Sequence, residues 1–529
     1  MRLLDQNLEF TRLPGALEAY RATATETQLP AFAAAVKQAG GRFVALWGSD
    51  ERDRNVNVHA NSGGYAVHVA FGIAEGLALV TLPLPANDDT AEPPGYPDLA
   101  EIFPAANRQQ RACFDLFGIR ARGGDQRPWL RHANWPADFF PLRRGVDPAQ
   151  RFETQNEDYA FVRVEGDGVH EIPVGPIHAG IIEPGHFRFS IVGERVLRLE
   201  QRLGWKHKGI EKRFEQLPLA EGYKLAGRVS GDSTVAFAWA YCLAAESLSG
   251  CTPPPRALWL RALLLERERI ANHLGDLGYL GNDAALSFGL SQFMRLKEDW
   301  LRLTGELFGH RFMMDAIVPG GVARDLPDGG GEKIFLQCNA IEREVRILKD
   351  IYDEHAGLQD RFLTTGRLDP ALAGELSISG LAGRASSQTW DLREQNPIPP
   401  YDQLNVQVAS HRNGDVAARV AVRFEEVFES LRLTRQMLVV LTDEVRRELV
   451  SPLPQPPDGA FGLGWIEGWR GDVLVALEAG PEGSIRRCHC HDPSTRIWPA
   501  LEHAIMGNIV PDFPLINKSF NLSYSGQDL

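Results

Sequence analysis

The sequence predicts an α+β domain at the N-terminus, followed by a mainly α-helical bundle domain that also carries small β-sheets. Three observations support this fold class. The first 145 residues combine short apolar strands with two short helical periods, a mixture typical of a small α+β unit. From about residue 170 long helical periods dominate, several of them over 20 residues, which suits a helix bundle. The chain has 529 residues, of which 44% are hydrophobic and 24% charged, an ordinary composition for a globular protein of several domains.

The first domain is placed at residues 1–145. Three apolar runs bounded by turn residues predict strands, over 42–47, 65–71 and 77–82. Two helices are predicted, at 28–40, which ends at a glycine pair, and at 107–117, which Gly118 stops. Residues 127–144 are rich in Pro, Arg and Trp and predict an irregular arm laid over a neighbour. Residues 146–170 are interpreted as a linker.

The second domain is placed at residues 171–529. It opens with a predicted strand pair at 171–174 and 187–192. Five helical periods follow, over 235–248, 257–280, 287–308, 332–358 and 416–445. Near the C-terminus the sequence predicts a hairpin, 464–470 with 473–478, and a third strand at 484–491.

Charge and cysteine content exclude several classes of protein. The formal charge of −13 and the pI near 5.6 make nucleic acid a poor partner, because an acidic chain repels phosphate. Six cysteines without a regular spacing do not suggest a disulfide framework. The first residues lack the apolar run of a secretory signal, and no stretch is long and apolar enough for a membrane helix. A reduced, cytoplasmic protein is therefore expected, which partners could still hold on a membrane.

Two groups of polar residues have both a structural and a catalytic interpretation. Glu266, Arg269 and His273 share one helix face, so they form either an ion-pair clamp between helices or a proton relay. Residues 207–212 precede a helical stretch and contain Glu211. If that carboxyl is buried, loss of solvation is expected to raise its pKa towards the working pH; otherwise the segment is an exposed charged turn.

Histidines and cysteines near one another offer only weak metal signals. The loop containing His178, Glu183 and His186 is more typical of a turn with solvated histidines than of a metal site. The run 488–491, Cys-His-Cys-His, falls in a predicted strand, where cysteines and histidines face opposite sides and cannot close a tetrahedral site. The sequence has no phosphate-binding loop, dinucleotide fingerprint or nucleophile elbow.

Several motifs, taken together, resemble a known pair of proteins of complex I, its C-type and D-type subunits. Residues 107–144 are similar to the signature of the C-type subunit, through 115–119 (Asp-Leu-Phe-Gly-Ile) and 141–144 (Pro-Leu-Arg-Arg), although the leading Glu-Arg-Glu reads Gln-Arg-Ala at 110–112. Residues 171–529 resemble the D-type subunit and, more closely, the large subunit of membrane-bound group 4 (hydrogenlyase-type, energy-converting) nickel–iron hydrogenases. The motifs of this second resemblance are 175–178, 183–188, 207–212, 266–276, 309–312, 319–322, 384–386 and 390–393.

The chain departs from this family at the metal site. The resemblance implies four cysteine thiolates, in Arg-x-Cys-Gly-x-Cys and Asp-Pro-Cys-x-x-Cys motifs. Here 228–233 and 521–526 occupy those segments, and the cysteine positions become Ser230, Ser233, Ser523 and Gly526. Protonated hydroxyls are hard ligands that cannot replace bridging thiolates. We therefore expect no nickel–iron centre and no cofactor or metal bound by this chain, with an iron–sulfur cluster on a partner subunit.

The resemblance also implies a quinone site, which is altered here as well. Where the D-type subunit has Arg-x-Asp-Tyr, this chain keeps Arg228 but has Ser-Gly at 230–231, and where it has a quinone-facing histidine the nearest histidine is His186. A remodelled pocket is therefore expected. Its predicted lining is Arg228, Ser230, Ser233, His186, Arg384 and Ser523, with Asp528 opposite and with Arg228 and Arg384 as hydrogen-bond partners. The predicted relay and pocket groups are Glu211, Asp232, His273 and Asp283.

Three functions follow from the resemblance. The first is a large peripheral-arm subunit of a membrane-bound complex I-like oxidoreductase, with the NADH dehydrogenase-like attributes of quinone and NAD binding and of electron transport coupled to ion translocation. The second is a non-catalytic structural or coupling subunit of the same kind of complex. The third is a hydrogenase with unconventional ligands. The implied partners are an iron–sulfur small subunit and membrane-embedded ion-translocating subunits, on the cytoplasmic face of the membrane.

Overall fold

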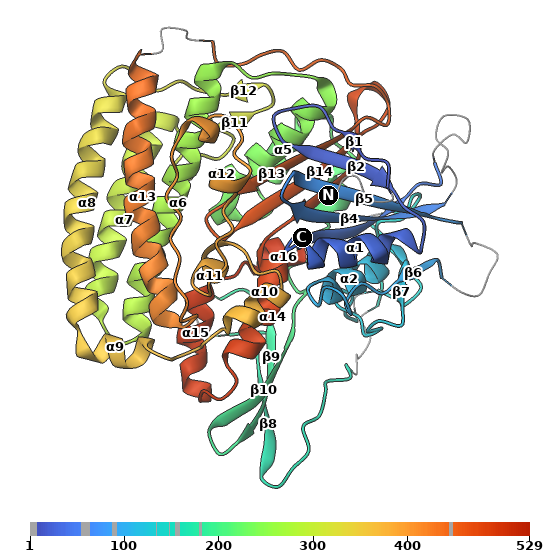
Figure 1. The fold of residues 1–529 in the computed structure, drawn as a ribbon, viewed down its shortest axis with the longest axis horizontal. Coiled ribbons are helices and arrows are strands. Elements are labelled where there is room, and N and C mark those ends of the chain that lie inside the picture. The colour runs from blue at the N-terminus through green and yellow to red at the C-terminus, as the bar shows by residue number, and fades with distance from the viewer. Residues whose placement is uncertain are drawn as a thin grey trace.

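The computed structural model describes residues 8–53, 64–86, 93–133, 135–147, 149–153, 159–178, 182–443 and 448–529. Figure 1 shows a helix bundle on one side, the N-terminal α+β unit on the other, and C-terminal strands and helices between them. A three-stranded sheet projects from the body below the two units. The predicted fold class is confirmed.

The N-terminal unit is a five-stranded sheet with two helices. Its strands have the order β1-β2-β5-β4-β3, with only β2 and β5 parallel. The bounds are β1 (Thr11–Arg12), β2 (Ala19–Thr23), β3 (Arg42–Asp50), β4 (Tyr65–Ile73), β5 (Gly76–Leu84), α1 (Gln28–Gln38) and α2 (Ala106–Phe117). Strands β1 and β2 were missed because they are short and partly exposed and so lack an apolar run. A small parallel pair follows, β6 (Gly95–Pro97) with β7 (Arg120–Arg122).

The irregular arm at 127–144 is confirmed for its described residues. The Asp115 carboxylate accepts hydrogen bonds from the backbone N–H groups of Trp129 and Leu130, at 2.6 and 2.7 Å. Farther along, the Arg144 guanidinium reaches the carbonyl of Arg486 in the second domain, at 2.8 Å. The arm therefore ties the two domains together. Residue 134 lies outside the described residues.

The projecting sheet has three antiparallel strands in the order β10-β9-β8. They are β8 (Val169–Val174), β9 (His186–Val192) and β10 (Arg195–Arg202). The predicted pair corresponds to β8 and β9. The third strand was missed because charged residues interrupt its apolar alternation, which Val196 and Leu199 carry on the buried side.

Four long helices make the bundle: α6 (Pro255–Asp283), α7 (Ser287–Phe308), α8 (Gly330–Glu354) and α13 (Val416–Asp443). The predicted helix 332–358 is wrong at its end, because α8 stops at Glu354 and the His355 side chain accepts the Leu358 N–H at 3.1 Å to start α9 (Ala356–Phe362). The last two residues of the predicted helix 416–445 lie outside the described residues. Within the described ranges, no helix combines the length and the apolarity that crossing a bilayer requires.

The remaining elements are short. Before the bundle come α3 (Ile210–Phe214), α4 (Gly222–Ala226) and the longer α5 (Thr234–Ser249). Between α7 and α13 lie β11 (Ile317–Val318), β12 (Gly321–Val322), α10 (Pro370–Glu375), α11 (Gly380–Arg384) and α12 (Leu392–Gln395). The chain ends with α14 (Ser494–Ala504), α15 (Phe513–Phe520) and α16 (Tyr524–Asp528).

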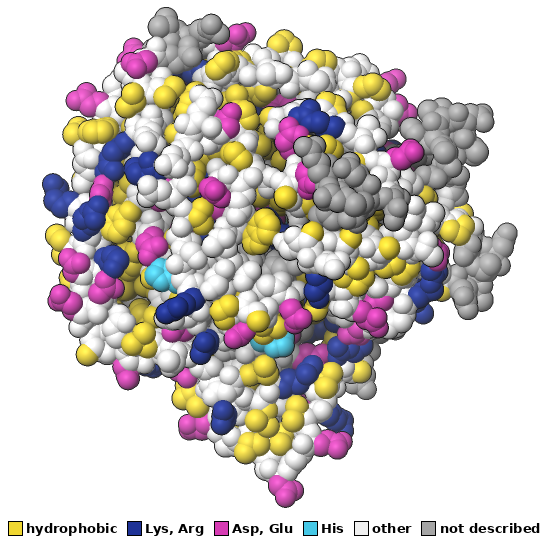
Figure 2. Space-filling model, viewed as in Figure 1, with side chains coloured by type: hydrophobic (Ala, Val, Ile, Leu, Met, Phe, Trp, Pro, Cys, Tyr) yellow, Lys and Arg dark blue, Asp and Glu magenta, His cyan; other side chains and the backbone are white. Residues whose placement is uncertain are grey.

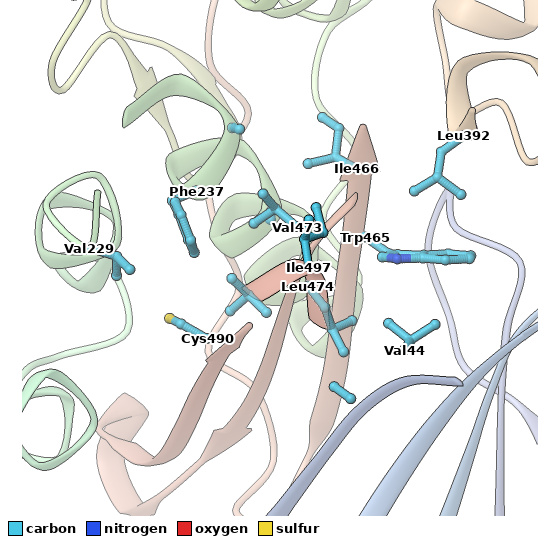
Figure 3. Close-up of a cluster of buried hydrophobic side chains, with 14 of the residues drawn as sticks. Val44, Val229, Phe237, Leu392, Trp465, Ile466, Val473, Leu474, Cys490 and Ile497 are labelled. Atoms are coloured by element: carbon cyan, nitrogen blue, oxygen red, sulfur yellow. The ribbon is translucent and has the colours of Figure 1, made fainter. Parts of the chain in front are cut away.

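A central antiparallel sheet joins the domains. Its strands are β13 (Phe461–Glu467), β14 (Asp472–Ala479) and β15 (Ile485–His491). Helix α5 lies so close to β13 that a Cβ at Gly464 would come within 1.8 Å of the Ala240 carbonyl oxygen. Figure 3 shows the apolar contacts around this sheet, with Phe237 of α5 on one side and Val44 of β3 on the other. The core is therefore continuous across the two domains.

One buried carboxylate holds three parts of the fold together. Asp472 on β14 is fully buried and accepts hydrogen bonds from Arg42 of β3 at 3.0 Å and from Trp465 of β13 at 2.9 Å. It also accepts from Arg496 of α14 and from Ser379. Burial opposes ionisation of this carboxyl, but the two guanidinium groups lower its pKa below the ordinary value.

Replacing this carboxylate should destabilise the whole chain. Asp472→Asn leaves two buried guanidinium groups without their counter-charge, so we expect the free energy of unfolding to fall by about 3–5 kcal/mol. Urea denaturation followed by circular dichroism measures the loss.

The matched control is Asp350→Asn, on the exposed face of α8, which should leave the urea midpoint unchanged. Because the folded-state pKa of Asp472 is depressed, its stabilisation is present above the unfolded pKa near 3.9 and is lost only as pH falls through the folded value. Equal midpoints for the two variants would contradict the assignment.

Candidate functional site

A cavity of about 640 Å³ opens between the projecting sheet, the C-terminal end of α6, helix α15 and the last residues of the chain. One end is polar and is made by Ser230, Asp232, Arg470 and Ser523. The walls are largely apolar, with Val174, Phe187, Phe513, Leu522 and Tyr524 among the lining residues. Figure 2 shows one face of the molecule, on which charged and apolar side chains are interspersed. Such a cavity suits a ligand with a polar head and an apolar body.

The first site loop is residues 230–233, which enter α5. Ser230 is extended, and Gly231–Ser233 form one 3-10 turn before the helix begins. The Glu268 carboxyl group of α6 accepts hydrogen bonds from two backbone N–H groups in the first turn of α5, those of Val235 and Ala236, at 2.7 and 3.2 Å. Burial raises the pKa of Glu268 to about 8 despite these bonds. The loop is thus anchored on α6.

Asp232 and Arg470 form an ion pair at the polar end of the cavity. The Arg470 guanidinium donates two hydrogen bonds to the Asp232 carboxylate, one of them 2.8 Å long. The Asp232 side chain is still 39% exposed, towards the cavity that it lines. Although burial opposes ionisation, the Arg470 charge and its hydrogen bonds lower the pKa of Asp232. Asp232 is therefore a carboxylate at neutral pH.

The second site loop contains residues 521–526. The Ser523 hydroxyl accepts the Gly526 N–H at 2.8 Å and starts α16. The same hydroxyl lies 2.8 Å from the Ser230 hydroxyl, whose oxygen lies 2.8 Å from Asp232 Oδ1. The structure therefore brings Ser230, Ser523 and Asp232 together, as the sequence predicts. Ser233 lies behind Asp232, buried, with its oxygen 3.4 Å from Asp232 Oδ1.

The residues present do not fit a nickel–iron centre. Three of the four positions offer hydroxyls and the fourth offers no side chain. A Cβ at Gly526 would come within 2.1 Å of the buried Asp492 carboxylate, so the space of the fourth ligand is taken. Within the described residues no group of three or more His, Cys, Asp or Glu side chains could hold a metal ion. Such a centre needs soft thiolates, and a network of hydroxyls and paired charges supplies none.

The predicted relay residues fall in different places. Asp283, at the end of α6, lines the cavity together with Lys518 and Tyr279, and burial raises its pKa. Glu211 lies outside the cavity, where its carboxylate meets His489 Nδ1 at 2.6 Å and Arg487 at 3.1 Å.

The expectation that burial raises the Glu211 pKa is wrong. Burial opposes ionisation, but the charges and hydrogen bonds of Arg487 and His489 lower the pKa of Glu211 to about 2. Its place in a proton relay stays a prediction.

Two arginines predicted to line the pocket lie elsewhere. Arg228 turns to the surface and forms an exposed ion pair with Asp315, at 2.7 Å. Arg384 is fully buried and pairs with Glu426 and Glu467, each at 2.8 Å. Arg228 belongs to the same motif as Ser230, but its side chain does not enter the cavity. The reason is that Arg228 precedes the 3-10 turn at 231–233, which directs the loop into the cavity. The partner of the site carboxylate is Arg470.

His273 and its helix row belong to a buried ion network. His273 Nε2 lies 2.8 Å from Glu426, and burial lowers the pKa of His273. Glu266 accepts hydrogen bonds from Arg393, Tyr401 and Ser430. This arrangement matches the ion-pair clamp between helices; a relay through it stays a prediction.

The histidines of the 175–186 loop hold the loop closed. His178 Nε2 lies 2.7 Å from the Gly185 carbonyl oxygen, and His186 Nδ1 lies 3.1 Å from that of Gly175. His178 lines the cavity and His186 does not. Asp528, expected opposite Ser230, instead accepts the backbone N–H groups of Gly204 and Lys206, and burial raises its pKa to about 6. Residues 179–181 lie outside the described residues.

The 488–491 run behaves as its strand pattern predicts. Cys488 and Cys490 share one face of β15, with their sulfur atoms 4.0 Å apart and both buried. His489 faces the other side, where it stacks on Trp47 at 4.5 Å and contacts Glu211. The cysteines pack in the apolar core shown in Figure 3, where Cys490 points towards Phe237 and Val229.

Sequence reasoning missed Trp469 and Arg470. The predicted strand 464–470 included them, but β13 ends at Glu467, so both residues sit in the turn to β14. A signal was available, because Gly468 and Gly471 flank the pair and glycines on both sides mark a turn. Nothing in the sequence indicated that this turn reaches loop 230–233.

Comparison with known proteins is consistent with this geometry. The family described as "Respiratory-chain NADH dehydrogenase, 30 Kd subunit" matches residues 22–151, and the family "Respiratory-chain NADH dehydrogenase, 49 Kd subunit" matches residues 284–451. Formate hydrogenlyase subunit 5 of Escherichia coli is 32% identical over 497 residues, covering 92% of this chain and 85% of its own. The C/D subunit of NADH-quinone oxidoreductase from Bacteroides thetaiotaomicron is 25% identical, covering 81% and 84%.

A solved structure shares the fold. It is the membrane-bound sulfane sulfur reductase, described as an archaeal respiratory membrane complex, and one of its chains aligns with a TM-score of 0.64 at 24% identity. The alignment covers 68% of this chain and 99% of that one. From the two family matches in one chain and the 32% identity over most of its length, we conclude that this chain belongs to the family of fused 30 Kd and 49 Kd NADH dehydrogenase-type subunits, which includes the large subunits of hydrogenlyases.

Proposed function

We propose that this chain is the large peripheral-arm subunit of a membrane-bound complex I-like oxidoreductase that passes electrons to a quinone-like acceptor and couples their transfer to ion translocation. It has no nickel–iron centre and binds no cofactor of its own. Electrons arrive from an iron–sulfur cluster on a small partner subunit. Membrane-embedded ion-translocating subunits hold the chain on the cytoplasmic face. Family membership, and relatives named as components of hydrogenlyase and NADH-quinone oxidoreductase, support these partners.

The observation that carries the proposal is the two-sided character of the cavity. Its polar end has the hydroxyls of Ser230 and Ser523 and the Asp232 carboxylate, and the rest of the lining combines aromatic and aliphatic side chains with the charged groups of Glu183, Asp283 and Lys518. A quinone-like head accepts hydrogen bonds at its oxygens, and its ring and tail favour apolar contact. About 640 Å³ is within the usual size of a small-molecule site.

The two cavity carboxyls support different roles. Reduction of a quinone to a quinol takes up two electrons and two protons. Asp232 stays ionised because Arg470 lowers its pKa, so it accepts a hydrogen bond from the Ser230 hydroxyl and orients that group rather than giving up a proton. Asp283 holds its proton more readily because burial raises its pKa, which makes it the better proton donor of the two.

One observation favours the non-catalytic alternative. The hydroxyls of Ser230 and Ser523 and the Asp232–Arg470 pair satisfy one another within the chain. A cluster that is complete without a ligand could serve only as a rigid support for coupling movements between subunits. Activity of the assembled complex separates the two functions.

Co-purification tests the assembly. With an affinity tag on this chain and mild solubilisation of membranes, we expect an iron–sulfur small subunit and antiporter-like membrane proteins to be recovered, identified by mass spectrometry. Recovery of the chain alone from the soluble fraction would remove the energy-coupling role.

Metal analysis tests the absence of the nickel–iron centre. Because hydroxyls replace the thiolates, we expect no stoichiometric nickel in the purified complex by plasma mass spectrometry and no reduction of a dye by hydrogen. Iron from the partner cluster serves as the internal control for metal recovery. One nickel atom per chain would support a hydrogenase with unconventional ligands instead.

Substitution in the cavity tests the pocket. Asp232→Asn removes the charge that Arg470 neutralises, so we expect the rate of electron transfer to a short-chain benzoquinone to fall about tenfold, equivalent to ~1.4 kcal/mol in the barrier. The control is Asp315→Asn, the same change in an exposed ion pair away from the cavity, which should keep the wild-type rate.

Glu211→Gln, in the same assay, tests the predicted relay. Unchanged activity and assembly in Asp232→Asn would defeat the pocket proposal, and unchanged activity in Glu211→Gln would defeat the relay. An assembled wild-type complex without quinone reductase activity would favour the non-catalytic alternative.

A further inference from the structure

We propose that Trp469 is a positioning residue, which fixes the Asp232–Arg470 pair at the polar end of the cavity and joins it to the buried ion network. The inference rests on the proposed function in one respect, namely that Asp232 is a functional carboxylate of the cavity. It concerns how the chain holds that carboxylate in place, which can be measured without turnover.

The indole N–H of Trp469 holds the first site loop. Nε1 lies 2.9 Å from the Asp232 carbonyl oxygen and 3.1 Å from the Ser233 hydroxyl. The side chain is almost completely buried, so water cannot replace these bonds at little cost. The Asn272 amide donates to the same carbonyl oxygen from α6, at 2.8 Å. Two donors from two elements therefore fix the main chain of Asp232.

The indole ring holds the other partner of the ion pair. The Arg470 guanidinium lies 4.0 Å from the ring centroid, a distance at which a cation and an aromatic face attract each other. Its planar fork faces the Asp232 carboxylate with two hydrogen bonds. One side chain therefore sets the position of both members of the pair, the carboxylate through its main chain and the guanidinium through its plane.

The bundle holds the turn that carries Trp469. Arg269 of α6 donates to the carbonyl oxygens of Gly468 and Glu467, at 3.0 and 2.8 Å. The His273 ring meets the Trp469 ring edge-on, with centroids 6.0 Å apart. The turn at 467–471 therefore connects the buried network of α6 and α13 to the cavity-lining pair of Asp232 and Arg470. Trp469 contacts both groups without lining the cavity itself.

The chain offers a closely matched control in Trp465. It lies on β13, four residues before Trp469, is equally buried, and donates its indole N–H to a buried carboxylate, Asp472, at 2.9 Å. Its ring lies 5.1 Å from the Arg42 guanidinium, and Figure 3 shows it on the side of Val44 and Leu392. Like Trp469 it does not line the cavity, but its indole N–H bonds to Asp472 instead of to loop 230–233. Replacing either tryptophan by phenylalanine removes one indole N–H and similar volume.

Carboxyl labelling of the assembled complex tests the inference. A water-soluble carbodiimide with glycine ethyl ester modifies accessible carboxyl groups, and peptide mass spectrometry measures the rate at each residue. Loss of one hydrogen bond, worth about 1 kcal/mol, raises the population in which Asp232 leaves Arg470 about fivefold. We therefore expect Trp469→Phe to raise the labelling rate of Asp232 by that factor, Trp469→Leu to raise it further, and Trp465→Phe to leave it unchanged. Labelling of Asp283 should be the same in all four proteins.

Several results would overturn the assignment. One is an unchanged labelling rate of Asp232 in Trp469→Phe. Another is an equal rise of that rate in Trp465→Phe, because it would show a general destabilisation of the fold and not a local role of Trp469. Trp469→Tyr, which fills more of the indole volume, is the second variant if Trp469→Phe fails to assemble. Failure of both to assemble, while Trp465→Phe assembles, would assign Trp469 a structural role. Because labelling needs no quinone, a complex inactive towards quinones can still confirm or refute the positioning role.

Discussion

The need to give every buried polar or charged side chain of helix α6 a partner organises the second domain. One row of this helix, Glu266, Arg269 and His273, meets charges and dipoles of α12, α13 and the β13–β14 turn. A second row, Glu268, Asn272 and Asp276, reaches the two site loops: Glu268 and Asn272 hold 230–236, and Asp276 accepts the Asn521 amide at 2.6 Å. A buried polar or charged group without a partner is costly, so each of these residues fixes the segment that supplies its partner. The cavity takes its shape from a helix that contributes little of its lining.

This arrangement explains why most of the fold, but only part of the site, could be predicted from sequence. Helix α7 has the predicted bounds, 287–308. The three strands of the central sheet, β13, β14 and β15, follow from their apolar runs. Such periods are local and are read directly from side-chain type. The motif resemblance placed Ser230 and Ser523 together although they are 293 positions apart, because the family's motifs carry that long-range information.

The missed residues share one physical cause. Arg228 and Arg470 both lie near the first site loop, but only the Arg470 side chain turns towards Asp232. The direction of each side chain depends on the 3-10 turn at 231–233 and on the residue at which β13 ends, and neither is evident from the sequence. Glu211 shows the same limit for electrostatics. The sequence left its burial open, and Arg487 and His489, which lower its pKa, come from β15, far along the chain. Asp283 keeps a raised pKa because the effect of burial outweighs the nearby charge of Lys518.

The surroundings of Gly526 limit which substitutions this chain can accept there. The Asp492 carboxylate occupies the volume next to Gly526, receives the Ser494 N–H at 2.8 Å and feels the charge of Arg470. Replacement of Gly526 by cysteine alone would bring the new side chain into collision with this carboxylate, and replacing Asp492 alone would remove a carboxyl group from the neighbourhood of a buried arginine. Each of these two single changes is therefore unfavourable, although the double change need not be. Positions 492 and 526 are therefore coupled, so that a side chain at 526 is accommodated only where the Asp492 carboxylate also moves or is replaced.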